Sequence, residues 1–224
     1  LPEGVYTCLI ENEDCKEQIL TPGMDDEIFS RTKVPMTKNE VRVLSISRLE
    51  LTKKAVVYDV GSGTGSVSAE CARLSPDIVV FAIEQKEEAA NLTKENAVRL
   101  GLSDQIVVIN KKAPEGFEEL PTPTHVFIGG SSGALSDILS AIQKKLIVKE
   151  NTKGVRVVIN AVSLETIAQI TKLIQMYPVK HVQLTQIQAS RAHKLGSYNL
   201  MQAQNPVLIA SFNLLPGDKM EADE

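Results

Sequence analysis

Three glycines at alternate positions give this chain its clearest chemical signal. Gly61, Gly63 and Gly65 follow an apolar run that ends in Asp59, and a helix-like segment begins at Ser66. Glycine permits a sharp turn and lets a ligand approach the backbone closely, while the N-terminus of a following helix offers unpaired N–H groups. The succession of strand, glycine-rich loop and helix therefore predicts a ligand-binding loop.

The spacing within the loop narrows the choice among nucleotide cofactors and phosphates. The dinucleotide fingerprint requires G-x-G-x-x-G, whereas here the third glycine comes one residue early. A phosphate-binding loop requires Gly-Lys-Ser/Thr, which is absent from this segment. Glu84 ends the next strand-like run, where a carboxylate would accept hydrogen bonds from ribose hydroxyls. The alternative is purely structural, with glycines that form a turn and a glutamate that caps a helix.

The segments around this loop alternate between strand-like and helix-like patterns. Runs rich in Val and Ile predict strands at 55–60, 79–84, 106–110, 124–129 and 155–162. Apolar residues at three- and four-residue spacing predict helices at 66–75, 86–100, 133–148 and 163–176. An earlier helix is predicted behind the capping box Thr37-Lys-Asn-Glu40. This alternation is typical of an α/β fold with a doubly wound, mostly parallel sheet.

The end of the chain departs from this alternation. Two strand-like runs, 181–190 and 205–213, are separated by a loop without room for a long helix. They must therefore pair antiparallel, as a terminal hairpin on the sheet. We expect one domain over 24–215, an N-terminal extension over 1–23 and a disordered acidic tail over 216–224.

Composition and charge limit the partners and the compartment. The net charge of −4 and the aromatic content of 4%, without Trp, disfavour a nucleic-acid partner. The three cysteines lack CxxC spacing, so we expect no metal site and a reducing, cytoplasmic location. The longest uncharged late stretch, 205–217, is too short to span a membrane, and no signal peptide is visible.

The order of the elements resembles the class I methyltransferases that use S-adenosylmethionine (SAM). A strand, a glycine loop, an acid at the end of the second strand and a terminal antiparallel hairpin are together the signature of that fold. The resemblance implies that Ala113, which follows the third strand, lies near the adenine of SAM. On the sequence alone, Ala113 is equally well a plain loop residue.

Five segments make the resemblance narrower. They are MDDEIFSRTKVPMTKNEVR (24–42), VYDVGSGTGSVSAE (57–70), VFIGGSSG (126–133), INAVSLET (159–166) and SRAHKLGSYNLMQAQNPV (190–207). In this order they are similar to the decarboxylating precorrin methyltransferases of cobalamin biosynthesis. The resemblance implies methylation of carbon 15 of a precorrin or cobalt-precorrin, with loss of CO2 from the ring C acetate, and a homotetramer. It also implies that SAM is bound by Thr37, Gly61, Ser62, Gly63, Thr64, Gly65, Glu84 and Ala113.

The N-terminal segment 5–14, VYTCLIENED, is similar to the closing strand of the C5-methyltransferase that many organisms fuse ahead of this enzyme. Together with a first residue that is Leu rather than Met, it suggests a module of a bifunctional protein. The alternative is a local edge strand over 5–10.

The implied substrate is a polyanion of acetate and propionate groups, so an acidic enzyme needs local cations. The candidates are Arg31, Lys33 and Lys38 before the first helix, and Arg191, His193 and Lys194 between the last two strands. We expect Arg191 to bind a carboxylate and His193 to transfer a proton, with Ser190 and Lys194 beside them. The alternative for each is a solvated surface residue.

Two further positions bear on the substrate. Asn160 follows the core of the fifth strand, where class I enzymes often meet their substrate, and its alternative role is to end that strand. Ser163 fits the N-cap of the next helix.

Many family members carry a His in the segment 197–201, where this chain has Asn199. Either that His is dispensable or proton transfer differs here.

Two other classes of function are alternatives to this one. A class I methyltransferase acting on RNA or protein is the first, but the chain lacks an NPPY-type motif and its acidity disfavours RNA. The second is a subunit of the same fold without activity, which the intact glycine loop and Glu84 disfavour.

Overall fold

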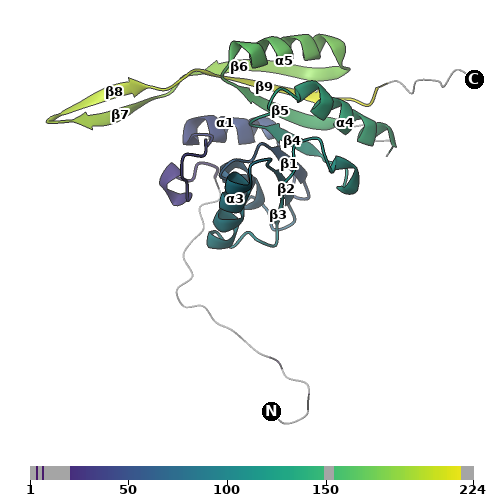
Figure 1. Ribbon diagram of the computed structural model, residues 1–224, viewed down its shortest axis with the longest axis horizontal. Coiled ribbons are helices and arrows are strands. Elements are labelled where there is room, and N and C mark those ends of the chain that lie inside the picture. Colours follow the sequence, from purple (N-terminus) through teal and green to yellow (C-terminus); the bar gives the residue numbers. More distant parts are fainter. Residues whose placement is uncertain (1–3, 5–6, 8–20, 149–153, 218–224) are drawn as a thin grey trace, which may run out of the picture.

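A seven-stranded sheet organises the chain, in the order β3-β2-β1-β4-β5-β9-β6. The computed structural model describes residues 4, 7, 21–148 and 154–217 (Figure 1). The strands are β1 (Val56–Val60), β2 (Val79–Ile83), β3 (Ile106–Ile109), β4 (His125–Ile128), β5 (Val155–Ala161), β6 (Val179–Ile187) and β9 (Val207–Leu214). Strands β1 to β5 pair in parallel, and β9 lies antiparallel between β5 and β6. The prediction of a doubly wound, mostly parallel sheet with a terminal antiparallel pair is confirmed.

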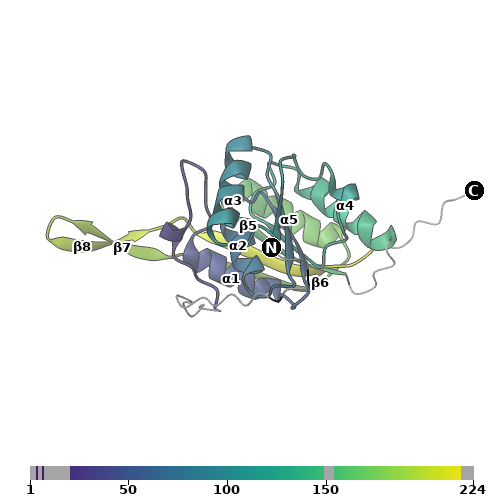
Figure 2. The ribbon, with the colours of Figure 1, turned by 90° about the horizontal axis from the view of Figure 1, so that it is seen from below.

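Helices cover both faces of this sheet (Figures 1 and 2). Apolar residues of α1 (Asn39–Leu49), α2 (Ser66–Ala72) and α3 (Glu87–Arg99) pack on one face, and those of α4 (Leu135–Val148) and α5 (Leu164–Met176) pack on the other. Two short 3-10 helices lie at Asp26–Ile28 and Phe117–Glu119. In β1, Val57 and Tyr58 are fully buried in opposite cores, because successive strand residues point to opposite faces.

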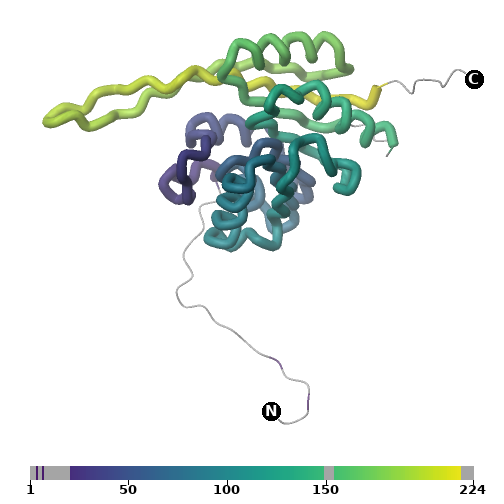
Figure 3. Tube along the Cα trace, viewed as in Figure 1, coloured from purple at the N-terminus to yellow at the C-terminus, as the bar shows by residue number. Residues whose placement is uncertain are grey.

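A second, two-stranded sheet was not predicted. The segment expected to be a loop between the last two strands forms a hairpin of β7 (Ser190–Leu195) and β8 (Tyr198–Ala203). Gly196 supplies a φ of +61° at its turn, so the two strands reverse direction over two residues. The hairpin projects away from the helices and the main sheet (Figures 1 and 3). The prediction of a loop over all of this segment was wrong, because its two halves pair with each other as antiparallel strands.

The start of α1 also corrects a prediction. The capping box would make Thr37 the N-cap and turn the Glu40 side chain back toward it, but the N-cap is Lys38, whose side chain makes no capping hydrogen bond. Glu40 instead accepts hydrogen bonds from Nε and Nη2 of Arg191, at 2.8 and 2.6 Å. The cap predicted at Ser163 is confirmed, since its hydroxyl accepts a hydrogen bond from the N–H of Thr166.

The fully buried Arg42 attaches the segment before α1 to the domain. Its guanidinium donates to Asp26 at 3.1 Å and to Glu70 at 3.3 Å, and lies 5.0 Å from the ring centre of Phe29. It also donates to the backbone carbonyls of Met24 and Thr37. One side chain on α1 therefore fixes both ends of the segment that passes over the glycine loop.

Several predictions concern residues outside the described part of the chain. Most of the expected extension over 1–23, including most of the strand-like run 5–10, and most of the tail over 216–224 lie there. Among the described residues, no helix is both long enough and apolar enough to cross a bilayer.

Candidate functional site

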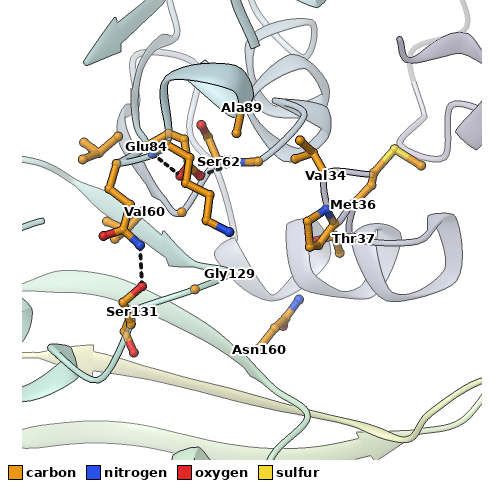
Figure 4. Close-up of a pocket in the computed structure, with 18 of the residues that line it drawn as sticks. Val34, Met36, Thr37, Val60, Ser62, Glu84, Ala89, Gly129, Ser131 and Asn160 are labelled. Atoms are coloured by element: carbon orange, nitrogen blue, oxygen red, sulfur yellow. Dashed lines mark hydrogen bonds between the residues drawn. The ribbon is translucent and has the colours of Figure 1, made fainter. Parts of the chain in front are cut away.

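A cavity of about 720 Å³ lies where the parallel strands end (Figure 4). The carboxyl ends of parallel strands meet at one edge, and chain connections that diverge there leave a crevice for ligands. The chain leaves β1 and β4, which are neighbours, toward opposite faces of the sheet. The cavity is lined by the glycine loop, by residues after β2, β3, β4 and β5, by the segment entering β9, and by residues 33–38. We call residues 30–38 the strap.

The glycine loop fits tightly between two neighbouring segments. Gly61 and Gly63 have φ values of +73° and +59°, which favour glycine. A Cβ atom on Gly61 would lie 2.6 Å from the carbonyl oxygen of Gly130, and one on Gly63 would lie 2.8 Å from that of Pro35. The loop therefore packs directly against the segment after β4 and against the strap, and it presents backbone rather than side chains to the cavity.

The residues predicted to bind a cofactor divide into two groups. Those that line the cavity are Thr37, Gly61, Ser62, Gly63, Glu84 and Ala113. Thr64 and Gly65 do not line it: Thr64 is fully buried, and the N–H of Gly65 closes the turn on the carbonyl of Ser62 at 2.8 Å. The structure thus brings six of the eight residues together around one space.

Glu84 couples the end of β2 to the glycine loop. Its Oε2 accepts a hydrogen bond from the N–H of Gly63 at 3.1 Å, and its Oε1 accepts one from the N–H of Lys86 at 2.9 Å. The N-cap of α3 is Lys86, so Glu84 is not the helix cap of the structural alternative. Its carboxylate holds the loop in shape and at the same time borders the cavity.

Asp59 lies buried beneath the loop. The Ser68 hydroxyl donates to its Oδ2, while Oδ1 has no hydrogen-bond partner within the described residues. Burial raises the pKa of Asp59 to about 6, and the nearby charge of Glu84 adds to this effect. Asp59 does not itself line the cavity, so it leaves a buried and only partly compensated carboxyl group next to the glycine loop.

The cations predicted to bind the substrate are divided between this cavity and a second one, which Arg31, Lys38 and Arg191 line together. Of the first predicted cluster, Lys33 and Lys38 line the cavity, whereas Arg31 lines a separate one. Lys86, Lys111 and Lys112 also border the cavity and were missed. The sequence feature that could have identified these lysines is their position just after β2 and β3, at the edge of the sheet where the cavity lies.

Arg191 and its neighbours lie elsewhere. None of Ser190, Arg191, His193 and Lys194 lines the cavity of this chain, since all four belong to the projecting hairpin. Arg191 pairs with Glu40 at 2.6 Å and with Asp26 at 2.8 Å, and its hydrogen bonds keep the pKa of Glu40 below its usual value. The charge that we expected to bind a substrate carboxylate is already shared by two carboxylates of the chain. The roles of these four residues toward a substrate stay predictions.

Asn160 lines the cavity from the end of β5. Figure 4 shows it across the cavity from Glu84. Its Nδ2 lies 3.0 Å from the Oγ of Ser45 on α1. Sequence reasoning identified Asn160 but not Ser45, because nothing local marks a serine in the middle of a helix as a partner of β5.

Comparisons with known proteins agree with this geometry. A family model described as a precorrin methyltransferase domain matches residues 27–213. The chain is 39% identical over 191 residues to a probable cobalt-precorrin-6B C(15)-methyltransferase (decarboxylating) of Pyrobaculum calidifontis, covering 84% of this chain and 94% of that protein.

Two solved structures are similar throughout. One is the precorrin-6y C5,15-methyltransferase of Geobacter metallireducens, with a TM-score of 0.77 and 30% identity, over 86% of this chain and 96% of that one. The other is the C-terminal domain of the precorrin-6Y C5,15-methyltransferase of Rhodobacter capsulatus, with a TM-score of 0.73 and 28% identity, over 88% of this chain and 100% of that one.

Proposed function

Because the chain belongs to the precorrin methyltransferase family, we propose that it transfers a methyl group from SAM to carbon 15 of a precorrin or cobalt-precorrin. The same enzyme would also release CO2, as the word decarboxylating in the names of its relatives indicates, and the family resemblance implies that the CO2 comes from the acetate side chain of ring C. One observation carries the proposal: a single cavity joins the Glu84-braced glycine loop to a border of lysines. The first end suits a nucleoside cofactor and the second suits a substrate with several carboxylates.

The residues at the first end fit SAM. The carboxylate of Glu84 would accept hydrogen bonds from the ribose hydroxyls, and Ala113 and the backbone after β3 would lie against the adenine. The closely packed glycine loop would leave room for the methionine part of SAM. When bound, SAM supplies a methyl group already activated by its positively charged sulfur.

The chain itself would hold the two reactants in position and keep water away from them. The strap is held on α3 by a hydrogen bond from the N–H of Ser30 to Asn96 at 2.7 Å, and by one from the Thr32 hydroxyl to Glu88 at 2.6 Å. It therefore forms a fixed wall that limits water around the reacting carbon. Holding two reactants in line inside such a wall accelerates a methyl transfer without a nucleophilic side chain.

The lysines supply the affinity for the macrocycle. Lys33 and Lys38 project from the strap, and Lys86, Lys111 and Lys112 follow β2 and β3. Flexible ammonium groups suit acetate and propionate groups that spread around a ring, because they act as point charges without a fixed geometry. The net charge of −4 makes this local positive border necessary for a polyanionic substrate.

The decisive experiment supplies SAM and cobalt-precorrin-6B, or its cobalt-free counterpart, to the purified protein. We expect a product that has gained one methyl group and lost one CO2, measured by mass spectrometry. A protein that binds SAM but methylates neither macrocycle would reject the proposed substrate and leave only the fold assignment.

We further propose that the enzyme is a homo-oligomer, a tetramer by family resemblance. The hairpin exposes Leu195, Tyr198, Leu200 and Met201, each at least half accessible to solvent. An isolated two-stranded hairpin is marginal in water, so an apolar one of this length needs a partner surface. Sedimentation should give a mass of several chains, and Leu200→Asp should lower it. A monomer at micromolar concentration would contradict this.

We also propose that this chain is fused to a C5-methyltransferase module in the native protein. Its support is the structural relative from Rhodobacter capsulatus, which is the C-terminal domain of such a protein. The size of the native polypeptide, measured by immunoblot, would decide it.

A further inference from the structure

Two parts of the cavity wall differ in their chemistry. The strap and the segments after β2 and β3 contribute the five lysines. The end of β5 and the segment entering β9 contribute Asn160, Val162, Gln204, Asn205 and Val207, which we call the amide wall. This wall carries three carboxamides and no charge. The two strands that frame it are paired, with Ala161 opposite Leu208, so the wall is a fixed surface.

A buried serine fixes the orientation of one of these carboxamides. Ser45 is fully buried on α1, and its hydroxyl lies 2.7 Å from the carbonyl of Val41, 3.0 Å from Nδ2 of Asn160 and 3.1 Å from Oδ1. A hydroxyl has one proton to donate, and the shortest of these contacts is to the Val41 carbonyl. Ser45 therefore accepts a hydrogen bond from Nδ2 of Asn160. The second N–H of that amide is left for a ligand.

We propose that the amide wall, with Asn160 held by Ser45, binds the acetate carboxylate that leaves as CO2. Ser45 is then a positioning residue, and Asn160 is the group that contacts the substrate. The inference rests on the proposed function and adds to it the place where the decarboxylated side chain lies.

The chemistry of the step favours an uncharged wall. The bond between the acetate methylene and its carboxylate breaks, CO2 leaves, and the electron pair stays on the methylene carbon, delocalised into the conjugated ring. A proton from water then converts the methylene into a methyl group. The carboxylate thus loses its charge in the transition state, so a lysine or arginine beside it would stabilise the starting state more and slow the step. An amide N–H orients the carboxylate with less of this penalty.

The remaining carboxylates of the macrocycle keep their charge throughout. They gain from the lysines on the other segments of the cavity without affecting the barrier. The division of the cavity into a charged border and an uncharged wall therefore matches a substrate with several permanent carboxylates and one that departs.

The test compares methyl transfer with CO2 release in single turnovers, using SAM labelled in its methyl group and precorrin labelled in the ring C acetate carboxylate. The variants are Ser45→Ala, Asn160→Ala and Ser45→Thr, which keeps the hydroxyl. Ser47→Ala, an exposed serine on the same helix, is the matched control. Binding of S-adenosylhomocysteine and thermal stability are measured for each.

We expect Ser45→Ala and Asn160→Ala to lower CO2 release at least about tenfold more than methyl transfer, since the acetate is then no longer held in the orientation that cleavage of its bond requires. A methylated product that retains its carboxylate should accumulate. Ser45→Thr should retain both steps, and Ser47→Ala should match the wild type.

Two outcomes would overturn the inference. In one, both steps fall in parallel in Asn160→Ala; in the other, that variant keeps wild-type CO2 release. Since Asn160→Ala does not remove the buried serine, it decides the matter even where Ser45→Ala fails to fold. A wild-type protein that performs neither step rejects the proposed function itself.

Discussion

Replacing Glu84 with alanine is expected to weaken the binding of S-adenosylhomocysteine by about a hundredfold. A hydrogen bond to a charged group contributes roughly 1.5–3 kcal/mol, and Glu84 would accept bonds from the ribose while it holds the N–H of Gly63. The variant loses both the ligand contact and the brace of the glycine loop. Titration calorimetry measures the change directly.

Two further variants make this experiment specific. Glu84→Gln keeps the size of the side chain and removes its charge, so its affinity should fall between those of the wild type and the alanine variant. Glu87→Gln removes an exposed carboxylate three residues away, outside the cavity, and should leave the affinity unchanged. An unchanged affinity in Glu84→Ala would remove this residue from the cofactor site.

Replacing Arg42 with methionine is expected to lower the free energy of unfolding by roughly 3–5 kcal/mol. Arg42 and Glu70 are fully buried and Asp26 is nearly so, and removing one partner of a buried ion pair leaves uncompensated charge. Burial raises the pKa of Asp26, but hydrogen bonds from Arg191 and Arg42 outweigh it and keep that pKa below its usual value. Urea denaturation monitored by circular dichroism measures the loss.

The matched control is Arg31→Met, which removes an exposed arginine from the strap and should change stability by less than about 0.5 kcal/mol. Cofactor affinity should also fall in Arg42→Met, because the carbonyl of Thr37, held by this side chain, positions the strap against the cavity. A destabilisation below about 1 kcal/mol would show that water compensates the two carboxylates.

Most patterns carried by a few consecutive residues proved reliable. The Val- and Ile-rich runs became β1 to β5, and the cap at Ser163 formed as predicted. The capping box at Thr37 did not form, although its residue types were right. Glu40 has a stronger partner in Arg191, which lies 151 residues away, and a salt bridge between charged groups outcompetes a backbone N–H.

Among the residues around the cavity, too, some could be identified from the sequence and others could not. Glu84 and the glycine loop were identifiable because each needs a particular residue type at a particular place in a strand–loop–helix unit. Which lysines face the cavity was not identifiable, since Lys33 and Arg31 are two residues apart on an irregular segment, and only its path over Gly63 decides their directions.

The sequence by itself determined the alternation of strands and helices, the glycine loop with its acidic partner, and the family. Each of these depends on backbone preferences or motifs that can be read locally. Only the tertiary structure decided that Ser45 meets Asn160 across 115 residues, and that Arg191 joins Asp26 across 165. Such pairs exist because the folded sheet and helices bring them together. No local preference encodes them, and they decide which polar groups remain free for a ligand.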